Sequence, residues 1–454
     1  MTTVHQAFRF ALDPTPTQSR HLRSHCGAAR FAFNWGLARV KDRLDARQAD
    51  ENSTVPWTLP ALRREWNHVK QQVAPWWAEN SKEAYSSGLE ALARALRSWS
   101  RARAATTPGR RVGFPRFKRK GRGPESCRFT TGPIRVEPGR HHVTLPRLGT
   151  IRTHESTRKL ARRIEHGTAR ILSATVSCRA DPWFVSFTVE VERNPNVNGG
   201  RDAVVGVDAG VHHLAVLSTG EIIENPRPGQ SHLRKLKRLN RELARRRPGS
   251  RRRAVTRRRL ARLHSRAKYV RQDHLHKLTT RLAKQYDVVV VEQLNVAGML
   301  RNRPLARAVA DTSMAELRRL LGYKTTWYGS RVFVADPWFP SSKTCSACGH
   351  VKAKLGLAER LYVCDSCGLK ADRDLNAARN LAQLAAGSGA EAQNARGPDV
   401  SLSHAEQSGQ KREASAGYSQ MRLAPPPSNR GLPESFPGTG RVTVLRLMAS
   451  QGGL

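Results

Sequence analysis

The sequence predicts a multidomain protein that mixes the α+β and α/β classes. Three observations lead to this prediction. Apolar residues recur at helical spacing from Thr17 to about Arg103, as expected for packed helices. Alternating segments separated by turn residues follow as far as Arg193 and predict strands. From Val204 onward, short apolar strands alternate with helical stretches, which is the pattern of an α/β domain.

The first half begins with a short strand followed by helices. HQAFRFAL, residues 5–12, alternates between apolar and polar side chains and ends at Asp13-Pro14. The helical stretch after it is broken near residues 56–60, where prolines cluster. Tryptophans at helical spacing, such as Trp76 and Trp99, are expected to pack in the core. Stacking on nucleobases is the less favoured alternative for them.

A basic and aromatic segment opens the strand-rich region. RRVGFPRFKRKGRG, residues 110–123, interleaves phenylalanines with cations. Because cations bind phosphates and rings stack on bases, Arg116, Lys118 and Arg119 are candidate nucleic-acid ligands. The alternative is an ordinary β-barrel with a basic face. The strands CRFTT, HHVTLPRLGTIRT and PWFVSFTVEVE follow, and a polar linker at residues 193–201 predicts a domain boundary.

The second half alternates strands and helices around one long basic stretch. VVGVDAGVHHLAVLSTGEII, residues 204–223, predicts three antiparallel strands joined by tight turns. A basic helical stretch runs from residue 233 to 285, with one break at residues 248–250. The later predicted elements are a strand at 287–292, a helix around 314–321, a strand at 331–336 and the closing helix DLNAARNLAQL.

The last part of the chain, from about Ala385 to Leu454, is rich in Gly, Ser, Pro, Gln and Ala. It has few large apolar residues whose burial could offset the conformational entropy of ordering. We therefore predict a disordered tail that is dispensable as protein. RVTVLRLM near its end is a weak candidate for an edge strand.

The charge of the chain indicates a polyanionic partner. The formal net charge is +43 and the isoelectric point is about 11.4. Such self-repulsion favours a nucleic-acid ligand, with an anionic membrane surface as the rival. No apolar run approaches the roughly 20 residues that span a bilayer, so we expect no membrane insertion. The N-terminus lacks the layout of a signal peptide, and we expect a cytosolic protein.

The arginine-rich run from Arg245 to Arg259 is either a solvated helix face or a phosphate-binding surface. Its density, unrelieved by acids, favours phosphate binding. The candidate ligands across the basic stretch are Arg234, Lys235, Lys237, Arg238, Arg245, Arg246, Arg251, Arg252, Arg257 and Arg258.

Two CxxC pairs predict a zinc ribbon, C-x2-C-x15-C-x2-C. The four cysteines are Cys345, Cys348, Cys364 and Cys367. Each pair forms a tight knuckle that aims two thiolates at one point, so we expect one structural Zn²⁺ per chain. Gly349 and Gly368 follow the knuckles, where a positive φ is often needed. The remaining cysteines are expected to be small buried or neutral residues: Cys26, Cys127 and Cys178.

Acids stand at the ends of predicted core elements. Asp208 ends one buried strand, Glu292 ends another, and Asp372 and Asp374 open the last helix. Acids in such places cost free energy unless they meet a cation. Convergent carboxylates suit two Mg²⁺ or Mn²⁺ ions, which could activate a water for phosphodiester hydrolysis.

The two acids at the start of the last helix are close in sequence, since Asp372 lies two residues before Asp374. Two residues correspond to roughly 200° around a helix, so both acids are not expected to reach one metal ion. Spacing alone does not choose between them. The one that is not a ligand could cap the helix or act behind the ligands.

These motifs resemble the TnpB family, the OrfB-type "putative transposase" related to type V CRISPR effectors. The catalytic segments VVGVDAG, VVVVEQLNV and CSACG…CDSCG…DRDLNAARN match the family's three RuvC motifs and zinc ribbon. FRFALDPTPTQSRHLRSHCGAARFAFNWGL resembles its helix-turn-helix-like segment, and GFPRFK is a further signature. The resemblance covers about residues 5–383.

The resemblance implies a division into domains. Residues 1–12 and 105–195 would form a wedge-like β-barrel that carries a helical recognition domain at 13–104. Residues 201–384 would form a RuvC-like nuclease domain of the RNase H fold, with the zinc ribbon at 341–371. The tail, residues 385–454, departs from the family and is a disordered appendage in this scheme.

The resemblance also implies an activity. Asp208, Glu292 and Asp374 would form the catalytic triad, and the DxNAARN context selects Asp374 over Asp372. The protein would be a Mg²⁺- or Mn²⁺-dependent, RNA-guided DNA endonuclease that binds a guide RNA from the element's end and a double-stranded DNA target. We expect a monomeric ribonucleoprotein in the bacterial cytoplasm, associated with the nucleoid. Guide RNA would bind the strand-rich region, and the arginine-rich helices would grip the guide–target duplex by its backbone.

Two other functions remain open from the sequence. An RNA-guided DNA-binding repressor would bind without cutting, although relatives of that kind lack RuvC acids that are present here. A transposase or accessory DNA-binding protein would act without RNA. RNA that copurifies with the protein would indicate the nuclease or the repressor. Absence of RNA would indicate the transposase or accessory DNA-binding protein.

Overall fold

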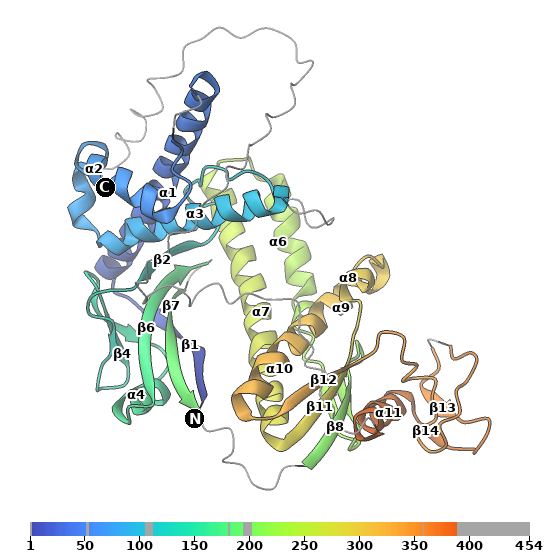
Figure 1. Ribbon diagram of the computed structural model, residues 1–454. Coiled ribbons are helices and arrows are strands. Elements are labelled where there is room, and N and C mark those ends of the chain that lie inside the picture. Colours follow the sequence, from blue (N-terminus) through green and yellow to red (C-terminus); the bar gives the residue numbers. More distant parts are fainter. Residues whose placement is uncertain are drawn as a thin grey trace, which may run out of the picture. The chain divides into compact units, whose positions relative to one another are not determined.

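In the computed structural model, the first strand lies in the middle of an antiparallel sheet, because later strands pair on both of its sides (Figure 1). The structure describes residues 2–50, 54–104, 112–179, 182–193, 202–356 and 358–387. The strand order is β2-β6-β7-β1-β5-β4-β3. The strands are β1 (Thr2–Asp13), β2 (Glu125–Phe129), β3 (Arg135–Val136), β4 (His142–Leu145), β5 (Gly149–Thr153), β6 (Ala169–Cys178) and β7 (Trp183–Arg193).

Three helices enter the chain between β1 and β2. They are α1 (Pro16–Ala49), α2 (Leu59–Val73) and α3 (Lys82–Ala104), with the short 3₁₀ helix η1 (Pro75–Glu79) between the last two. Helices and sheet share one apolar cluster, which includes Leu37 of α1, Leu89 of α3 and Val185 of β7. Because the helices and the sheet share this core, the structure does not divide them into two domains. The predicted division into a β-barrel at 1–12 and 105–195 and a helical domain at 13–104 stays a prediction.

Aromatic side chains in this region contact one another, but the predicted core position is wrong for Trp76, which is 38% exposed, and Trp99 is only partly buried. Trp99 stacks on Trp57 with ring centroids 6.0 Å apart and planes 11° from parallel. Trp76 meets Phe31 edge-on, with centroids 5.2 Å apart. The helix break predicted near residues 56–60 lies just before α2, which begins at Leu59.

A second sheet has five strands in the order β10-β9-β8-β11-β12 (Figure 1). β8, β11 and β12 are parallel, whereas β9 and β10 are antiparallel to their neighbours. The strands are β8 (Asp202–Asp208), β9 (His213–Leu217), β10 (Ile222–Glu224), β11 (Tyr286–Glu292) and β12 (Arg331–Ala335).

Helices cover both faces of this sheet. These are α7 (Arg251–Gln285) and α10 (Met314–Tyr328) on one face and α11 (Arg373–Gly387) on the other. The helices α5 (Pro228–Ser231), α6 (Leu233–Arg245), α8 (Val296–Met299) and α9 (Arg303–Thr312) also belong to this half of the chain. Alternate residues of β11 point to opposite faces. Val289 and Val291 join the apolar cluster with α7 and α10, while Val290 packs with Leu381 of α11.

Helix α11 approaches β8 unusually closely, at Gly206. A Cβ atom on Gly206 would lie 1.9 Å from the carbonyl oxygen of Ala378. No other residue type leaves room for this contact without moving backbone. The glycine therefore fixes the distance between α11 and the strand that ends in Asp208.

Between β12 and α11 the chain forms a small cysteine-rich unit. Its hairpin consists of β13 (Leu361–Val363) and β14 (Lys370–Asp372). Cys345 and Cys348 lie on a turn before this hairpin, and Cys364 and Cys367 lie on the turn between its two strands.

Most elements agree with the sequence, and several short ones were not predicted. The basic helical stretch is α6 and α7, broken between Arg245 and Arg251 as expected. Strand β6 and the helices α4 (Arg158–Glu165), α5, α8 and α9 have no counterpart in the prediction. The described pairings end at β2 and β3, so closure of the seven-stranded sheet into a barrel stays a prediction.

Two of the sequence expectations fall outside the described residues. Most of the predicted linker at 193–201 and nearly all of the predicted tail at 385–454 lie there. Among the described helices, none combines the length and the apolar character needed to cross a membrane.

The close approach at Gly206 makes a stability prediction. Gly206→Ala forces a methyl group into backbone, and overpacking of this kind costs about 1–3 kcal/mol or more. We expect a clear loss of stability in thermal or denaturant unfolding. Gly322→Ala on α10 is the matched control, because a Cβ atom at this position would have no neighbouring atom within 4 Å. That change should be neutral or stabilise by up to about 1 kcal/mol; equal stability of both variants would contradict the packing argument.

Candidate functional site

Three acids predicted from the sequence come together at one edge of the five-stranded sheet. Asp208 and Glu292 end the parallel neighbours β8 and β11, where Val207 pairs with Val291. Asp374 lies in the first turn of α11, the helix that packs on β8. Carboxyl ends of parallel strands are the usual place for a binding site in an open α/β sheet.

The electrostatics of this cluster favour a bound cation. Burial raises the pKa of Asp208 well above its usual range, and the nearby charges of Glu292 and Asp374 raise it further. All three carboxyl groups are only partly exposed. Like charges held together in this way repel one another unless a cation lies between them. Their oxygen donors fit a hard divalent ion such as Mg²⁺ or Mn²⁺.

The neighbouring acid Asp372 has a different role. Its Oδ1 accepts hydrogen bonds from the backbone N–H groups of Asp374 at 2.9 Å and Leu375 at 3.0 Å. It therefore caps the N-terminus of α11 and is exposed. Of the two alternatives that the sequence left open, the structure gives capping to Asp372. The charge of Asp374 raises the pKa of Asp208 more than that of Asp372 does, and Oδ1 of Asp374 lies 3.8 Å from Nη1 of Arg360.

Glu292 has a neighbour that sequence reasoning missed. The hydroxyl group of Ser341 donates a hydrogen bond to Oε1 of Glu292. A pocket of about 290 Å³ opens beside Glu292 and is lined by Leu294, Met314 and Arg318 among others. No local pattern marks Ser341, because it meets Glu292 only through the fold.

The four ribbon cysteines converge as predicted. Their sulfur atoms all lie within 4.8 Å of one another, and the pairs Cys345–Cys367 and Cys348–Cys364 are 3.6 Å apart. Gly349 and Gly368 take φ angles of +76° and +72° directly after the knuckles. The backbone N–H of Cys367 lowers the pKa of the Cys364 thiol to about 6. This set of four thiol groups could hold one zinc ion with no open position.

The other cysteines lie apart from this cluster. Cys26 and Cys127 are buried, and burial raises the pKa of both thiols. They behave as small apolar residues, as expected.

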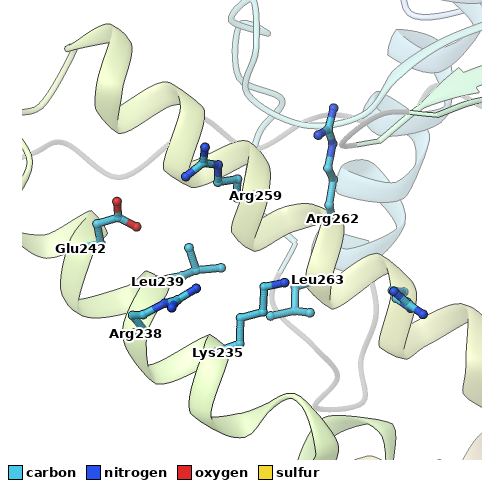
Figure 2. Close-up of a pocket in the computed structure, with 8 residues that line it drawn as sticks. Lys235, Arg238, Leu239, Glu242, Arg259, Arg262 and Leu263 are labelled. Atoms are coloured by element: carbon cyan, nitrogen blue, oxygen red, sulfur yellow. The ribbon is translucent and has the colours of Figure 1, made fainter.

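A basic groove of about 640 Å³ lies between α6 and α7 (Figure 2). We define it by its lining residues: Lys235, Arg238, Leu239, Glu242, Arg259, Arg262, Leu263 and Arg266. Figure 2 shows the cations on both helices around the two leucines. Five cations against one acid would attract a phosphate backbone.

The basic groove contains only part of the predicted phosphate-binding set. Lys235 and Arg238 line it, and so does Arg259, which ends the predicted arginine run, whereas Arg262 and Arg266 were missed. Their helical spacing from Arg259, i, i+3 and i+7, was the signal that could have identified them. The other predicted residues of this stretch lie outside the lining and are exposed except for Arg246: Arg234, Lys237, Arg245, Arg251, Arg252, Arg257 and Arg258.

Arg246 braces the turn between α6 and α7. Its guanidinium group donates to Glu242, to the hydroxyl of Thr256 at 2.5 Å and to the carbonyl of Arg252 at 2.5 Å. These contacts occupy its donors within the chain. Its prediction as a phosphate ligand is therefore the weakest of this set.

The predicted ligands near residue 116 also differ in the contacts that they make within the chain. Arg116 and Arg119 are exposed. Lys118 lies with its Nζ 3.8 Å from the ring centroid of Phe33, and its backbone exchanges two hydrogen bonds with the side chain of Asn34. Lys118 thus attaches this segment to α1.

Comparison with known families gives three matches. A model described as "Probable transposase" of the OrfB type matches residues 186–303. A model described as "Cas12f1-like, TNB domain" matches residues 315–381, and a helix-turn-helix model matches residues 1–49.

Similar proteins cover most of the chain. A Mycobacterium tuberculosis protein named "Putative RNA-guided DNA endonuclease" is 46% identical over 83% of this chain and 86% of its own length. InsQ of Escherichia coli, which has the same descriptive name, is 32% identical over 84% of this chain and 92% of its own length. Among solved structures, a Cas12f1–sgRNA–target DNA complex has a TM-score of 0.45 at 13% identity. That match covers 84% of this chain and 99% of the other.

The thiol cluster predicts one zinc ion per chain, measured by elemental analysis. Cys348→Ser should lose this zinc and unfold the ribbon, because structural zinc binding contributes roughly 10–16 kcal/mol in isolated fingers. Cys178→Ser removes a cysteine outside the cluster and should keep the zinc. Absence of zinc from the parent protein would refute the site.

The basic groove predicts a salt-dependent affinity for nucleic acid. Replacing Arg259, Arg262 and Arg266 with Gln should weaken duplex binding and flatten the plot of log affinity against log salt. Each phosphate that the variant no longer neutralises should change that slope by about 0.9.

A control variant removes the same formal charge from arginines outside the groove and the strand-rich region that are ion-paired to glutamates: Arg39, Arg281 and Arg319. Its salt slope should stay close to that of the parent. An equal loss of affinity in both variants would mean that net charge, and not the groove, governs binding.

Proposed function

Because the chain belongs to the TnpB family of OrfB-type insertion-element proteins, we propose that it is an RNA-guided DNA endonuclease. The observation that carries this proposal is the convergence of Asp208, Glu292 and Asp374 at one sheet edge. The names of relatives that match most of their own length support it.

The proposed nuclease domain spans residues 201–384 and has a RuvC-like RNase H fold, with the zinc ribbon at 341–371. The parallel strands β8 and β11 and the packing of α11 on β8 support this assignment. The proposed wedge-like domain is built from residues 1–12 and 105–195, with a helical recognition domain at 13–104. The seven-stranded sheet and the helices between β1 and β2 support it.

In this proposal Asp208, Glu292 and Asp374 hold two Mg²⁺ or Mn²⁺ ions. When bound, such a pair supplies an activated water and stabilises the leaving 3′ oxygen of a phosphodiester. The chain's own contribution is positional. The ends of the adjacent strands β8 and β11 carry Asp208 and Glu292, and the capped start of α11 carries Asp374, whose charge acts on Asp208.

The proposed partners are a guide RNA and a double-stranded DNA target. A net charge of +43 and the basic groove between α6 and α7 support binding of a nucleic-acid backbone. We assign the guide–target duplex to this groove and the guide RNA to the strand-rich region, including Arg116 and Arg119. The proposed state is a monomeric ribonucleoprotein.

An RNA-guided repressor is the second candidate, because it needs the same binding surfaces but no cutting. The presence of all three acids, Asp208, Glu292 and Asp374, favours the nuclease, since a protein that only binds does not need them. Sequencing the RNA that copurifies with the protein, then supplying DNA that matches it together with Mg²⁺, separates the two functions. Cleavage of matching DNA alone supports the proposal; binding without cleavage supports the repressor, and absence of RNA contradicts both.

Single substitutions in the acid cluster test which carboxyl groups are needed for cleavage. Asp208→Ala, Glu292→Ala and Asp374→Ala should each reduce cleavage to background and leave guided DNA binding largely intact, because each removes a proposed metal ligand. Asp372→Ala should keep cleavage and lose roughly 1 kcal/mol of stability as a missing helix cap. Asp372→Asn, which keeps a capping oxygen, is the control. Loss of cutting in Asp372→Ala but not in Asp374→Ala would overturn the assignment.

A further inference from the structure

The segment that links β12 to the first knuckle of the ribbon passes directly beside Glu292. Ser341 on this segment is 3% exposed, and its hydroxyl donates to Oε1 of Glu292. An ionised carboxylate can only accept, so the hydroxyl hydrogen is directed at Glu292. This leaves Oε2 of the same carboxylate for a second interaction.

Helix α11 holds this segment through a row of amide side chains. Nδ2 of Asn380 donates to the carbonyl oxygens of Ser341 at 2.7 Å and Thr344 at 2.6 Å. Asn376 donates to the carbonyl of Thr344 at 2.7 Å and accepts from the backbone N–H of Ser346 at 2.9 Å. Both asparagines are buried, at 0% and 3% exposed.

These contacts tie three features to a single helix. Asn376 and Asn380 are four residues apart and so lie on one face of α11. The same helix begins with Asp374, and the segment that it clamps contains Cys345 of the ribbon. Residues 341–346 contain Cys345 of the thiol cluster and are joined to α11 and Glu292 by buried and partly buried hydrogen bonds.

We propose that Ser341 is a positioning residue for Glu292, held in place by the clamp that Asn376 and Asn380 form on residues 341–346. This inference rests on the proposed function, since it assigns Glu292 to a divalent ion. A glutamate side chain has three rotatable bonds, and a fixed donor on one oxygen selects the rotamer that aims the other. Groups that orient metal ligands in this way typically change metal affinity or activity by about 10- to 100-fold when removed.

A second hydroxyl on the same segment separates positioning from simple support of the loop. The hydroxyl of Thr344 donates to the carbonyl of Pro340 at 2.9 Å, which is a contact within the segment. Thr344→Val and Ser341→Ala each remove one hydroxyl from the clamped segment. Only Ser341→Ala removes a donor to an acid of the candidate site.

The experiment uses the full chain purified with its guide RNA. Mn²⁺ binding is measured by calorimetry, and cleavage is measured as a function of Mg²⁺ concentration. Ser341→Ala should weaken Mn²⁺ binding and raise the Mg²⁺ needed for half-maximal cleavage by about 10- to 100-fold. Zinc content and guided DNA affinity should match the parent. Thr344→Val should match the parent in all four measurements.

A double-mutant cycle tests whether Ser341 acts through Glu292. In a Glu292→Gln background, adding Ser341→Ala should leave Mn²⁺ affinity unchanged within about twofold. A further loss in that background, or loss of zinc in Ser341→Ala, would assign Ser341 to the ribbon fold and overturn the proposal. The proposal would also be overturned if Ser341→Ala alone kept both its Mn²⁺ affinity and the Mg²⁺ needed for half-maximal cleavage within about twofold of the parent.

The two proposals fail separately. If the parent binds guide and target but does not cut, the proposed endonuclease is wrong. The Mn²⁺ titrations of parent, Ser341→Ala and Thr344→Val still decide the role of Ser341.

Discussion

The contact between α11 and β8 at Gly206 is the constraint on which the candidate site depends. It places the start of α11 beside the strand end that bears Asp208, although the two elements are far apart in sequence. It also places the amide face of α11 against the segment that leads into the ribbon. A side chain at position 206 would separate the helix from the sheet, and both arrangements would change together.

The cluster of acids is costly for the folded chain without a partner. Burial and like charge oppose ionisation of Asp208, and no cation of the side chains neutralises all three acids within the described residues. Elsewhere the chain has a large excess of positive charge. The molecule therefore concentrates negative charge at one sheet edge and positive charge along α6 and α7, an arrangement suited to divalent ions and to a polyanion respectively.

Local patterns predicted the parts of the site that are encoded locally. The CxxC spacing predicted the convergence of Cys345 and Cys364, and polar residues after apolar strands predicted that Asp208 and Glu292 lie at one edge. Composition identified α6 and α7 as basic but did not show which cations share a groove, because that depends on how two helices face each other.

What the sequence did not predict depends on contacts between distant segments. Ser341 is one of two adjacent serines, and nothing local distinguishes it as the neighbour of Glu292. Arg246 belongs to an arginine run but is engaged by Glu242 and Thr256 across a turn. Strand β6, which pairs with both β2 and β7, was missed although its residues 172–178 alternate between apolar and polar side chains, so this element could have been predicted. The roles of the individual site residues remain proposals.

The position of α11 late in the chain has a consequence for synthesis on the ribosome. β8 and β11 emerge first, but their α11-facing side chains, such as Val290, stay uncovered until Leu381 has been made. A polypeptide that stops before α11 would lack Asp374, the asparagine clamp and the cover of one sheet face. Such a fragment would expose apolar surface that chaperones and proteases recognise, and it could not complete the acid cluster. In the proposed nuclease, the order in which the parts are translated would therefore keep an unfinished chain from cutting.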